Sequence, residues 1–147
     1  MKEAGGKNLD RTDASRKNLV LDRKDGNRRL PDTELEVMQA VWALGGPASR
    51  AEIDEILRKK HPMAQTTLLT LLSRLAEKGF LKIEKTGRSA RYIPLVGKEE
   101  YQAEQSRRFL DQLFGGNLPA FALALSGSGL SREELAELRD LLDKEAL

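Results

Sequence analysis

The sequence lacks cysteine and has only one histidine, which limits the chemistry open to its 147 residues. Without cysteine the chain forms no disulfide, no thiolate metal site and no thiol redox sensor. A lone His61 argues against a histidine-based metal centre or a catalytic dyad. We therefore expect no catalytic residue, no metal and no cofactor, and we predict that the protein is not an enzyme.

Long apolar stretches are also missing. No run approaches the roughly 20 apolar residues that a membrane-spanning helix requires, and the N-terminus lacks the apolar core of a secretory signal. These absences predict a cytoplasmic location and no membrane insertion.

Neither sign of charge is in large excess, but the charges are unevenly distributed. The formal net charge is only +2. Residues 56–97 hold nine basic side chains against two acidic ones, whereas residues 98–147 hold six basic and ten acidic ones. A basic segment of this kind is expected on a surface that neutralises phosphate groups.

The stretch at 64–79 predicts an amphipathic helix. Leucines recur at steps of three and four and give the helix one apolar stripe, formed by Leu68, Leu71, Leu72 and Leu75. The polar side chains that fall largely outside this stripe are Thr66, Thr67, Thr70 and Arg74. Gly79 ends the helix, because glycine readily takes the left-handed conformation of a C-terminal cap. One face can therefore enter a core while another offers hydroxyl groups and a guanidinium.

The segment that follows predicts a β-hairpin with a basic tip. Residues 81–85 and 90–93 alternate with a period of two around the turn at 86–89. The basic side chains near this tip are Lys85, Arg88 and Arg91. A polar helix that leads into a basic hairpin is what a winged helix-turn-helix presents to DNA. The alternative is an ordinary amphipathic helix and hairpin whose charges are merely solvated.

Two shorter helices are predicted before this stretch. Asp32 or Thr33 can cap the first, and Thr33 with Glu36 fits a capping box. Ser49 with Glu52 repeats that signature at the start of the second. In this order of three helices and a hairpin, the third helix takes the position that enters the major groove in a helix-turn-helix.

The last third of the sequence predicts a helical region that requires a second chain. Apolar residues recur at helical spacing, and Ser131 with Glu134 forms another capping box. About 50 residues of this composition bury too little surface to be stable alone. The residues that we predict at a homodimer interface are Tyr101, Phe109, Leu113, Phe114, Leu135, Leu138 and Leu142. The alternative is packing of this region against the chain's own winged helix.

The complete prediction is a mainly α fold with a small β-hairpin wing. Residues 1–29 are rich in polar and charged side chains without sustained periodicity, which predicts a disordered tail. Residues 30–97 form the winged helix-turn-helix DNA-binding domain, and residues 98–147 form the C-terminal helical dimerisation region.

Several motifs resemble the BlaI/MecI/CopY family of penicillinase-type repressors. They are L-P-D-T-E-L-E-V-M-Q-A-V-W at 30–42, A-Q-T-T-L-L-T-L-L-S-R-L-A-E-K-G-F-L at 64–81, G-R-S-A-R-Y-I-P-L-V at 87–96 and F-L-D-Q-L-F-G-G at 109–116. The resemblance covers residues 30–147, and its motifs occur in the family's order. It implies a homodimeric transcriptional repressor bound to a palindromic double-stranded DNA operator with TACA/TGTA-like half-sites.

The resemblance also implies functional residues. Family contacts to DNA from the third helix fall on Thr66, Thr67, Thr70 and Arg74, and wing contacts fall near Lys85, Arg88 and Arg91. In relatives that are paired with a membrane sensor metalloprotease, the repressor is cut near the start of the dimerisation region. The matching bond here joins Arg108 and Phe109, where Arg108 replaces the asparagine of well-known cleaved relatives. Copper-responsive relatives use a cysteine-rich site, which this chain lacks.

A second reading from a different functional class stays open at this point. A winged helix can also serve as a protein-interaction module, in which the basic side chains only solvate the surface. The two readings differ in salt dependence, because each phosphate that a DNA-binding protein neutralises releases counterions.

Overall fold

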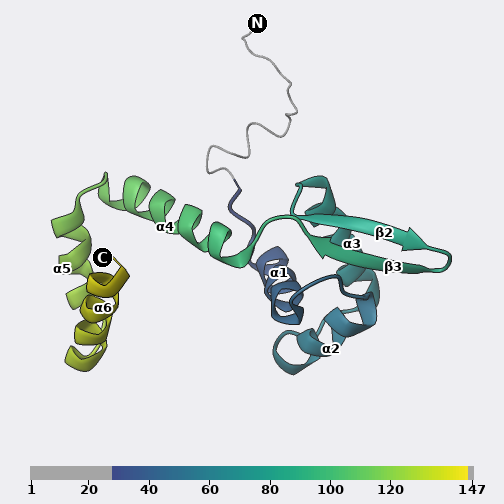
Figure 1. The fold of residues 1–147 in the computed structure, drawn as a ribbon, viewed down its shortest axis with the longest axis horizontal. Helices are drawn as coiled ribbons and strands as arrows, with labels where there is room; N and C mark the ends of the chain where they lie inside the picture. Colours follow the sequence, from purple (N-terminus) through teal and green to yellow (C-terminus); the bar gives the residue numbers. More distant parts are fainter. Residues whose placement is uncertain (1–27, 146–147) are drawn as a thin grey trace, which may run out of the picture. The chain divides into compact units, whose positions relative to one another are not determined.

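The computed structural model describes residues 28–145, and Figure 1 shows the order of its elements along the chain. The chain divides into two compact units, of which the first ends at Gln105 and the second begins at Ser106. Helix α4 (Lys98–Phe114) contributes residues to both units. The tail predicted at residues 1–29 lies outside the described residues, apart from its last two positions.

The first unit follows the predicted order of helices and hairpin. Its elements before α4 are α1 (Asp32–Leu44), α2 (Arg50–Lys60), α3 (Gln65–Glu77), β2 (Leu81–Thr86) and β3 (Ser89–Pro94) (Figure 1). This arrangement confirms the predicted mainly helical fold with a small β-hairpin wing. Among the described residues, no helix is long and apolar enough to cross a membrane.

The first two helices begin in different ways. At the start of α2, the Ser49 hydroxyl accepts a hydrogen bond from the Glu52 amide at 3.1 Å, and the Glu52 carboxylate accepts one from the Ser49 amide at 2.9 Å. This confirms the predicted capping box. The box predicted for Thr33 and Glu36 is wrong, because α1 begins directly after Pro31 and has no side-chain cap hydrogen bond. Thr33 therefore lies inside the first turn, past the capping position.

Glycines shape both ends of the segment between α3 and the tip of the hairpin. Gly79 has a φ of 84°, the left-handed conformation that ends the helix as predicted. Strands β2 and β3 pair antiparallel up to Thr86 opposite Ser89. The turn between them is Gly87-Arg88, where Gly87 has a φ of 63°. Arg88 thus lies at the tip of the wing.

The base of the hairpin is joined to the loop between α1 and α2. Ala48 and Tyr92 exchange backbone hydrogen bonds of 3.0 and 2.7 Å. The Arg91 guanidinium also donates a hydrogen bond to the Pro47 carbonyl at 3.1 Å. The wing is therefore fixed to the helices at its base.

Apolar side chains from all these elements form the core of the first unit. The α3 stripe enters it as predicted, and the largest fully buried side chains are Phe80, Met38, Ile53, Leu68, Leu72, Leu75, Leu81, Val37 and Val41. Glu34 is also buried, and its carboxylate accepts a hydrogen bond from the Lys78 ammonium at the end of α3. This ion pair joins the first turn of α1 to the residue that caps α3.

The first turns of α4 belong to the same core. Tyr101 is 5% exposed, and its hydroxyl accepts a hydrogen bond of 2.8 Å from the Leu30 amide. Its ring also packs against Trp42 and Phe80, each at a centroid distance of 5.7 Å. Tyr101 is therefore a core residue of the first unit and is not on a surface open to a second chain, in contrast to the interface predicted from the sequence.

Arg28 lies next to this aromatic cluster. Its side chain is only 12% exposed, forms ion pairs with Glu100 and Glu104, and has its guanidinium carbon 5.9 Å from the centroid of Phe80. Burial lowers the pKa of the guanidinium, but hydrogen bonds to Glu104 and Glu100 outweigh this and raise its pKa above the ordinary value. Arg28 thus stays charged and connects the start of the described chain to α4.

The second unit has local order but no buried residue. Helices α5 (Leu118–Ser126) and α6 (Arg132–Glu145) follow α4, and α6 begins with the predicted capping box of Ser131 and Glu134. The rings of Phe109, Phe114 and Phe121 lie 5.3 to 6.4 Å apart. Even so, none of the described residues from Ser106 to Glu145 reaches the burial of a core position.

Candidate nucleic-acid interface

Helix α3 presents a polar face to solvent. Its leucine stripe is buried, and the side chains on the opposite side are exposed. Each of the four residues predicted to contact DNA from this helix is exposed, namely Thr66, Thr67, Thr70 and Arg74. The helix has no acidic residue in its first turn and no side-chain cap hydrogen bond, so its first amides have no partner from the cap.

One hydrogen bond defines the chemistry of this face more closely than the sequence does. The Thr70 hydroxyl donates to the Thr66 carbonyl at 3.0 Å. Because a hydroxyl has a single proton, Thr70 is left with acceptor capacity and a methyl group to offer to a ligand. Thr66 keeps its own hydroxyl proton for an outside acceptor.

Three exposed cations near this face have no internal partner. Arg74, Lys85 and Arg88 form no ion pair or side-chain hydrogen bond with any residue that the structure describes. By contrast, Lys82 on the same hairpin is paired with Glu84 at 3.4 Å. Charges without a partner are available to phosphate groups without first breaking an internal contact.

Arg91 differs from the other predicted wing contacts. Its hydrogen bond to Pro47 gives it a role at the base of the wing. Arg91 also lowers the pKa of Glu52, although the main causes of that shift are the hydrogen bonds of the Glu52 carboxylate to the backbone and side chain of Ser49. Arg91 therefore has a structural role in addition to its positive charge.

Two exposed residues of α3 were not included in the sequence prediction. Ser73 and Leu69 lie three or four positions from Thr70 and belong to the same side of the helix. Leu69 is 40% exposed and is not part of the core cluster. The helical spacing alone could have identified both, but a leucine inside an apolar stretch was assumed to be buried.

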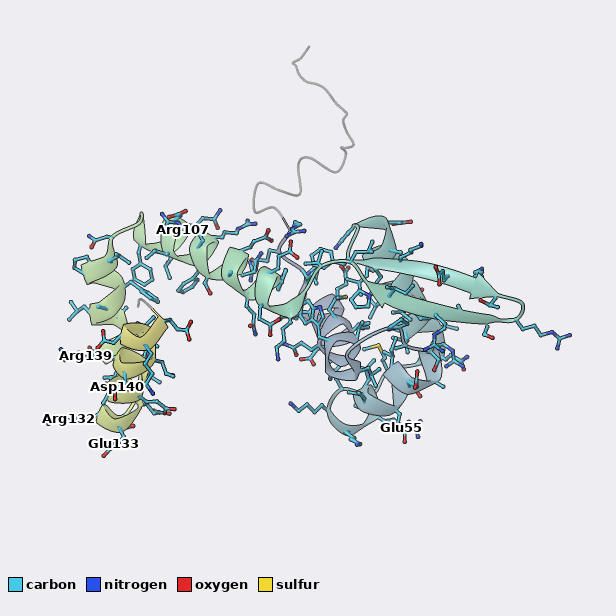
Figure 2. The ribbon with its side chains drawn as sticks, viewed as in Figure 1. Glu55, Arg107, Arg132, Glu133, Arg139 and Asp140 are labelled. Carbon is cyan, nitrogen blue, oxygen red and sulfur yellow. The ribbon has the colours of Figure 1, made fainter. Side chains whose placement is uncertain are left out.

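The second unit carries the other predicted interface residues. Leu113 and Leu142 are 63% and 60% exposed, and Phe109 is also exposed. The side chains that are half-buried within the unit are Phe114, Leu135 and Leu138. Exposed leucines that the sequence analysis did not place at the interface are Leu118, Leu123 and Leu141. Charged side chains project from the same helices and include Arg107, Arg132, Arg139 and Asp140 (Figure 2).

The bond predicted for proteolysis lies inside a helix. Arg108 and Phe109 are both within α4, and the Arg108 side chain donates a hydrogen bond to Gln112 at 3.2 Å. A protease that binds its substrate in an extended conformation would require local opening of α4 at this point.

The helices, the hairpin and its exposed cations define the class of the protein, which is a winged helix-turn-helix protein. The profile described as "Penicillinase repressor" matches residues 30–144. The penicillinase repressor of Bacillus licheniformis is 33% identical over 117 residues, covering 79% of this chain and 91% of that protein. The methicillin resistance regulatory protein MecI of Staphylococcus aureus (strain N315) is 28% identical over 116 residues, covering 78% of this chain and 94% of that protein.

The chain belongs to the penicillinase repressor family, which is a family of transcriptional repressors. This confirms the family and the functional class expected from the sequence, a DNA-binding transcriptional repressor. A solution structure titled as the DNA-binding domain of the repressor BlaI is also similar, with 33% sequence identity and a TM-score of 0.44 over 50% of this chain and 88% of that one.

Proposed function

We propose that this protein represses transcription as a homodimer bound to a palindromic operator, with α3 in the major groove and the wing along the phosphate backbone. The observation that carries this proposal is the set of exposed cations without internal partners, Arg74, Lys85 and Arg88, around a face of α3 that is free of the core. A helix of this kind fits the major groove of B-DNA, which is about 12 Å wide.

Each predicted contact has a distinct part in this arrangement. Lys85 and Arg88 on the wing contact phosphates and fix the register of the protein on the duplex. Arg74 reaches either a phosphate or the acceptor edge of a guanine. Thr66 and Thr67 offer hydroxyl groups to phosphate or base acceptors, whereas Thr70 accepts a hydrogen bond because its proton is already donated to Thr66.

Dimerisation is proposed from the missing core of the second unit. Residues 106–145 contain no buried side chain, yet they expose Leu113, Leu123 and Leu142 to more than half of their surface. A second chain that covers these leucines would provide the burial that the unit lacks alone. A symmetric pair of chains reads a palindromic site, because the two-fold axis of the protein then coincides with that of the operator.

Salt dependence tests DNA binding directly. The full chain is titrated against an inverted repeat selected from its own promoter and against a scrambled duplex, at several salt concentrations. We expect the logarithm of affinity to fall with the logarithm of salt at a slope near −0.9 per phosphate contact. Lys85→Ala with Arg88→Ala should reduce the steepness of that slope by about 2 per protomer. Lys144→Ala in the second unit is the matched control and should leave it unchanged.

The same titration separates this proposal from its alternative. A protein-interaction module would show no preference for the inverted repeat over the scrambled duplex, and the wing substitutions would have no effect on its salt slope. Either result would contradict a role for this face in reading an operator.

We further propose that cleavage between Arg108 and Phe109 by a membrane sensor metalloprotease ends repression. Cutting there would separate the first unit from α5 and α6, so that the paired leucines no longer hold two DNA-binding units together. The test is intact mass spectrometry of the protein from induced and uninduced cells. A fragment that ends at Arg108 should appear only on induction, and repression relieved without that fragment would contradict cleavage at this bond.

A further inference from the structure

Leu69 is an unusual residue for the exposed face of α3. Among the described residues of the first unit, Leu69 and Leu95 are the large apolar side chains that remain exposed, at 40% and 56%. Leu69 follows Thr66 by three positions and precedes Ser73 by four, so the three share the outward side of the helix. Exposing a leucine to water at this position brings the isolated protein no stability.

The neighbours of Leu69 make this part of the helix poor in hydrogen-bond donors. Thr70 is next to it in sequence, and the Thr70 hydroxyl proton is donated to the Thr66 carbonyl. What remains for a ligand at these two positions is apolar surface together with one hydroxyl acceptor. A base pair that matches this surface must offer a methyl group and an amino donor.

The major-groove edge of an A·T pair has both groups. Thymine carries the C5 methyl, and adenine carries the N6 amino donor. A G·C pair has an amino donor but no methyl group. The cations without partners on the same side of the protein, Arg74 and Lys85 among them, favour a polyanion as the occupant over an apolar protein surface.

We propose that Leu69 reads a thymine methyl group in each half-site and thereby makes this repressor select an A·T pair at that position. Thr70 accepts a hydrogen bond from the adenine amino group of the same or the adjacent pair. The inference rests on the proposed operator binding and adds the position on α3 that distinguishes A·T from G·C.

The test removes the methyl group and nothing else. The full-length protein is first used to select an inverted repeat, and each thymidine of one half-site is then replaced in turn by deoxyuridine. We expect one replacement to weaken binding of the wild-type protein about fourfold, the loss of one buried methyl group. The Leu69→Ala variant should bind the unmodified repeat more weakly and show no further loss from that replacement.

A matched control and a folding check complete the experiment. Leu95→Ala removes the other exposed leucine of the first unit and should retain the wild-type fourfold response to deoxyuridine. The fluorescence of Trp42, the only tryptophan, confirms that each variant is folded. The inference is overturned if Leu69→Ala loses the same factor as the wild-type protein, or if no deoxyuridine weakens the wild-type complex. Failure of the proposed function differs from both, since the wild-type protein would then not distinguish the selected repeat from a scrambled duplex.

Discussion

Arg74 is exposed on α3 and makes no ion pair among the described residues, so its replacement tests the DNA-facing side of the helix without removing an internal contact. We expect Arg74→Ala to weaken operator binding by about 1 to 3 kcal/mol, the usual value of a specific guanidinium contact. The thermal midpoint followed by Trp42 fluorescence should stay within the range of a surface substitution.

The lysine variant at the same position distinguishes a base contact from a phosphate contact. Arg74→Lys keeps the positive charge but loses the planar fork that binds guanine through two hydrogen bonds. Recovery of wild-type affinity by lysine would indicate phosphate contact, and a loss as large as that of alanine would indicate base reading. Unchanged affinity in both variants, measured by gel-shift titration, would contradict the assigned face.

Arg28 is expected to stabilise the first unit even though it lies ahead of the first helix. Arg28→Ala leaves Glu100 and Glu104 without their shared cation and removes the guanidinium from the ring of Phe80. We expect the free energy of unfolding of this unit to fall by about 1 to 3 kcal/mol, measured by urea titration with Trp42 fluorescence. Arg29→Ala, which alters an exposed neighbour, should stay within about 0.5 kcal/mol of the wild-type protein.

The residues that the sequence could not assign correctly depend on distant partners. Tyr101 reads as an interface anchor in a one-dimensional pattern, whereas its hydroxyl binds Leu30, which is 71 positions away in the chain. Arg28 reads as part of a charged tail for the same reason, because its acidic partners lie on α4. Periodicity reports which side of a helix is apolar, but it does not report which unit covers that side.

At the scale of elements, the capping box of α2 makes the protein sensitive to acid. Hydrogen bonds to the backbone and side chain of Ser49 lower the pKa of Glu52 below its ordinary value of 4.5. A carboxylate whose pKa is lower in the folded state stabilises the fold above its unfolded pKa, and this contribution is lost as the pH falls through the folded pKa. We therefore expect Glu52→Gln to destabilise the protein at neutral pH and to have little effect at a pH well below 4.5.

The matched control for this prediction is Glu36→Gln. Glu36 has the same capping-box spacing in the sequence, but α1 has no side-chain cap hydrogen bond. Urea midpoints at the two pH values should therefore differ between Glu52→Gln and the wild-type protein, and not between Glu36→Gln and the wild-type protein. An equal response of both variants would show that the capping box is not the cause.

The elements themselves were largely predictable, because their signals are local. The leucine stripe of α3, the period-two pattern of the hairpin and the boxes at Ser49 and Ser131 are all contained in short windows of sequence. The failed box at Thr33 shows the limit of such signals, since Pro31 starts the helix earlier than the motif requires. The same limit applies to Leu69, whose exposure depends on how α3 is rotated against the rest of the core.

At the scale of the whole molecule, the two units differ in how they obtain their stability. The first has a core that includes Phe80, Ile53 and Leu72 at 1% exposure or less. The second has capped helices and a cluster of phenylalanine rings, but no buried side chain among residues 106–145. Helices of this length are marginal in water without tertiary packing. The order of the second unit is thus expected to depend on protein concentration, as for other subunits that fold on association.

The last prediction uses this difference to separate dimerisation from DNA recognition. Leu142 is 60% exposed on α6, and Leu142→Glu would place a charge within the proposed interface. We expect the sedimentation profile to shift to monomer, while the unfolding of the first unit reported by Trp42 is unchanged. Affinity for the full inverted repeat should then fall by about 10²- to 10⁴-fold, because the two linked DNA-binding units no longer act together. Affinity for a single half-site should stay the same.

Lys144→Glu is the matched control, because it changes charge on the opposite side of the same helix. This variant should remain dimeric and bind the full repeat with wild-type affinity. If Leu142→Glu stays dimeric, the interface lies outside the leucine face of α6. If it becomes monomeric but retains full affinity for the repeat, operator recognition does not depend on pairing through the second unit, since each DNA-binding unit would then bind its half-site independently.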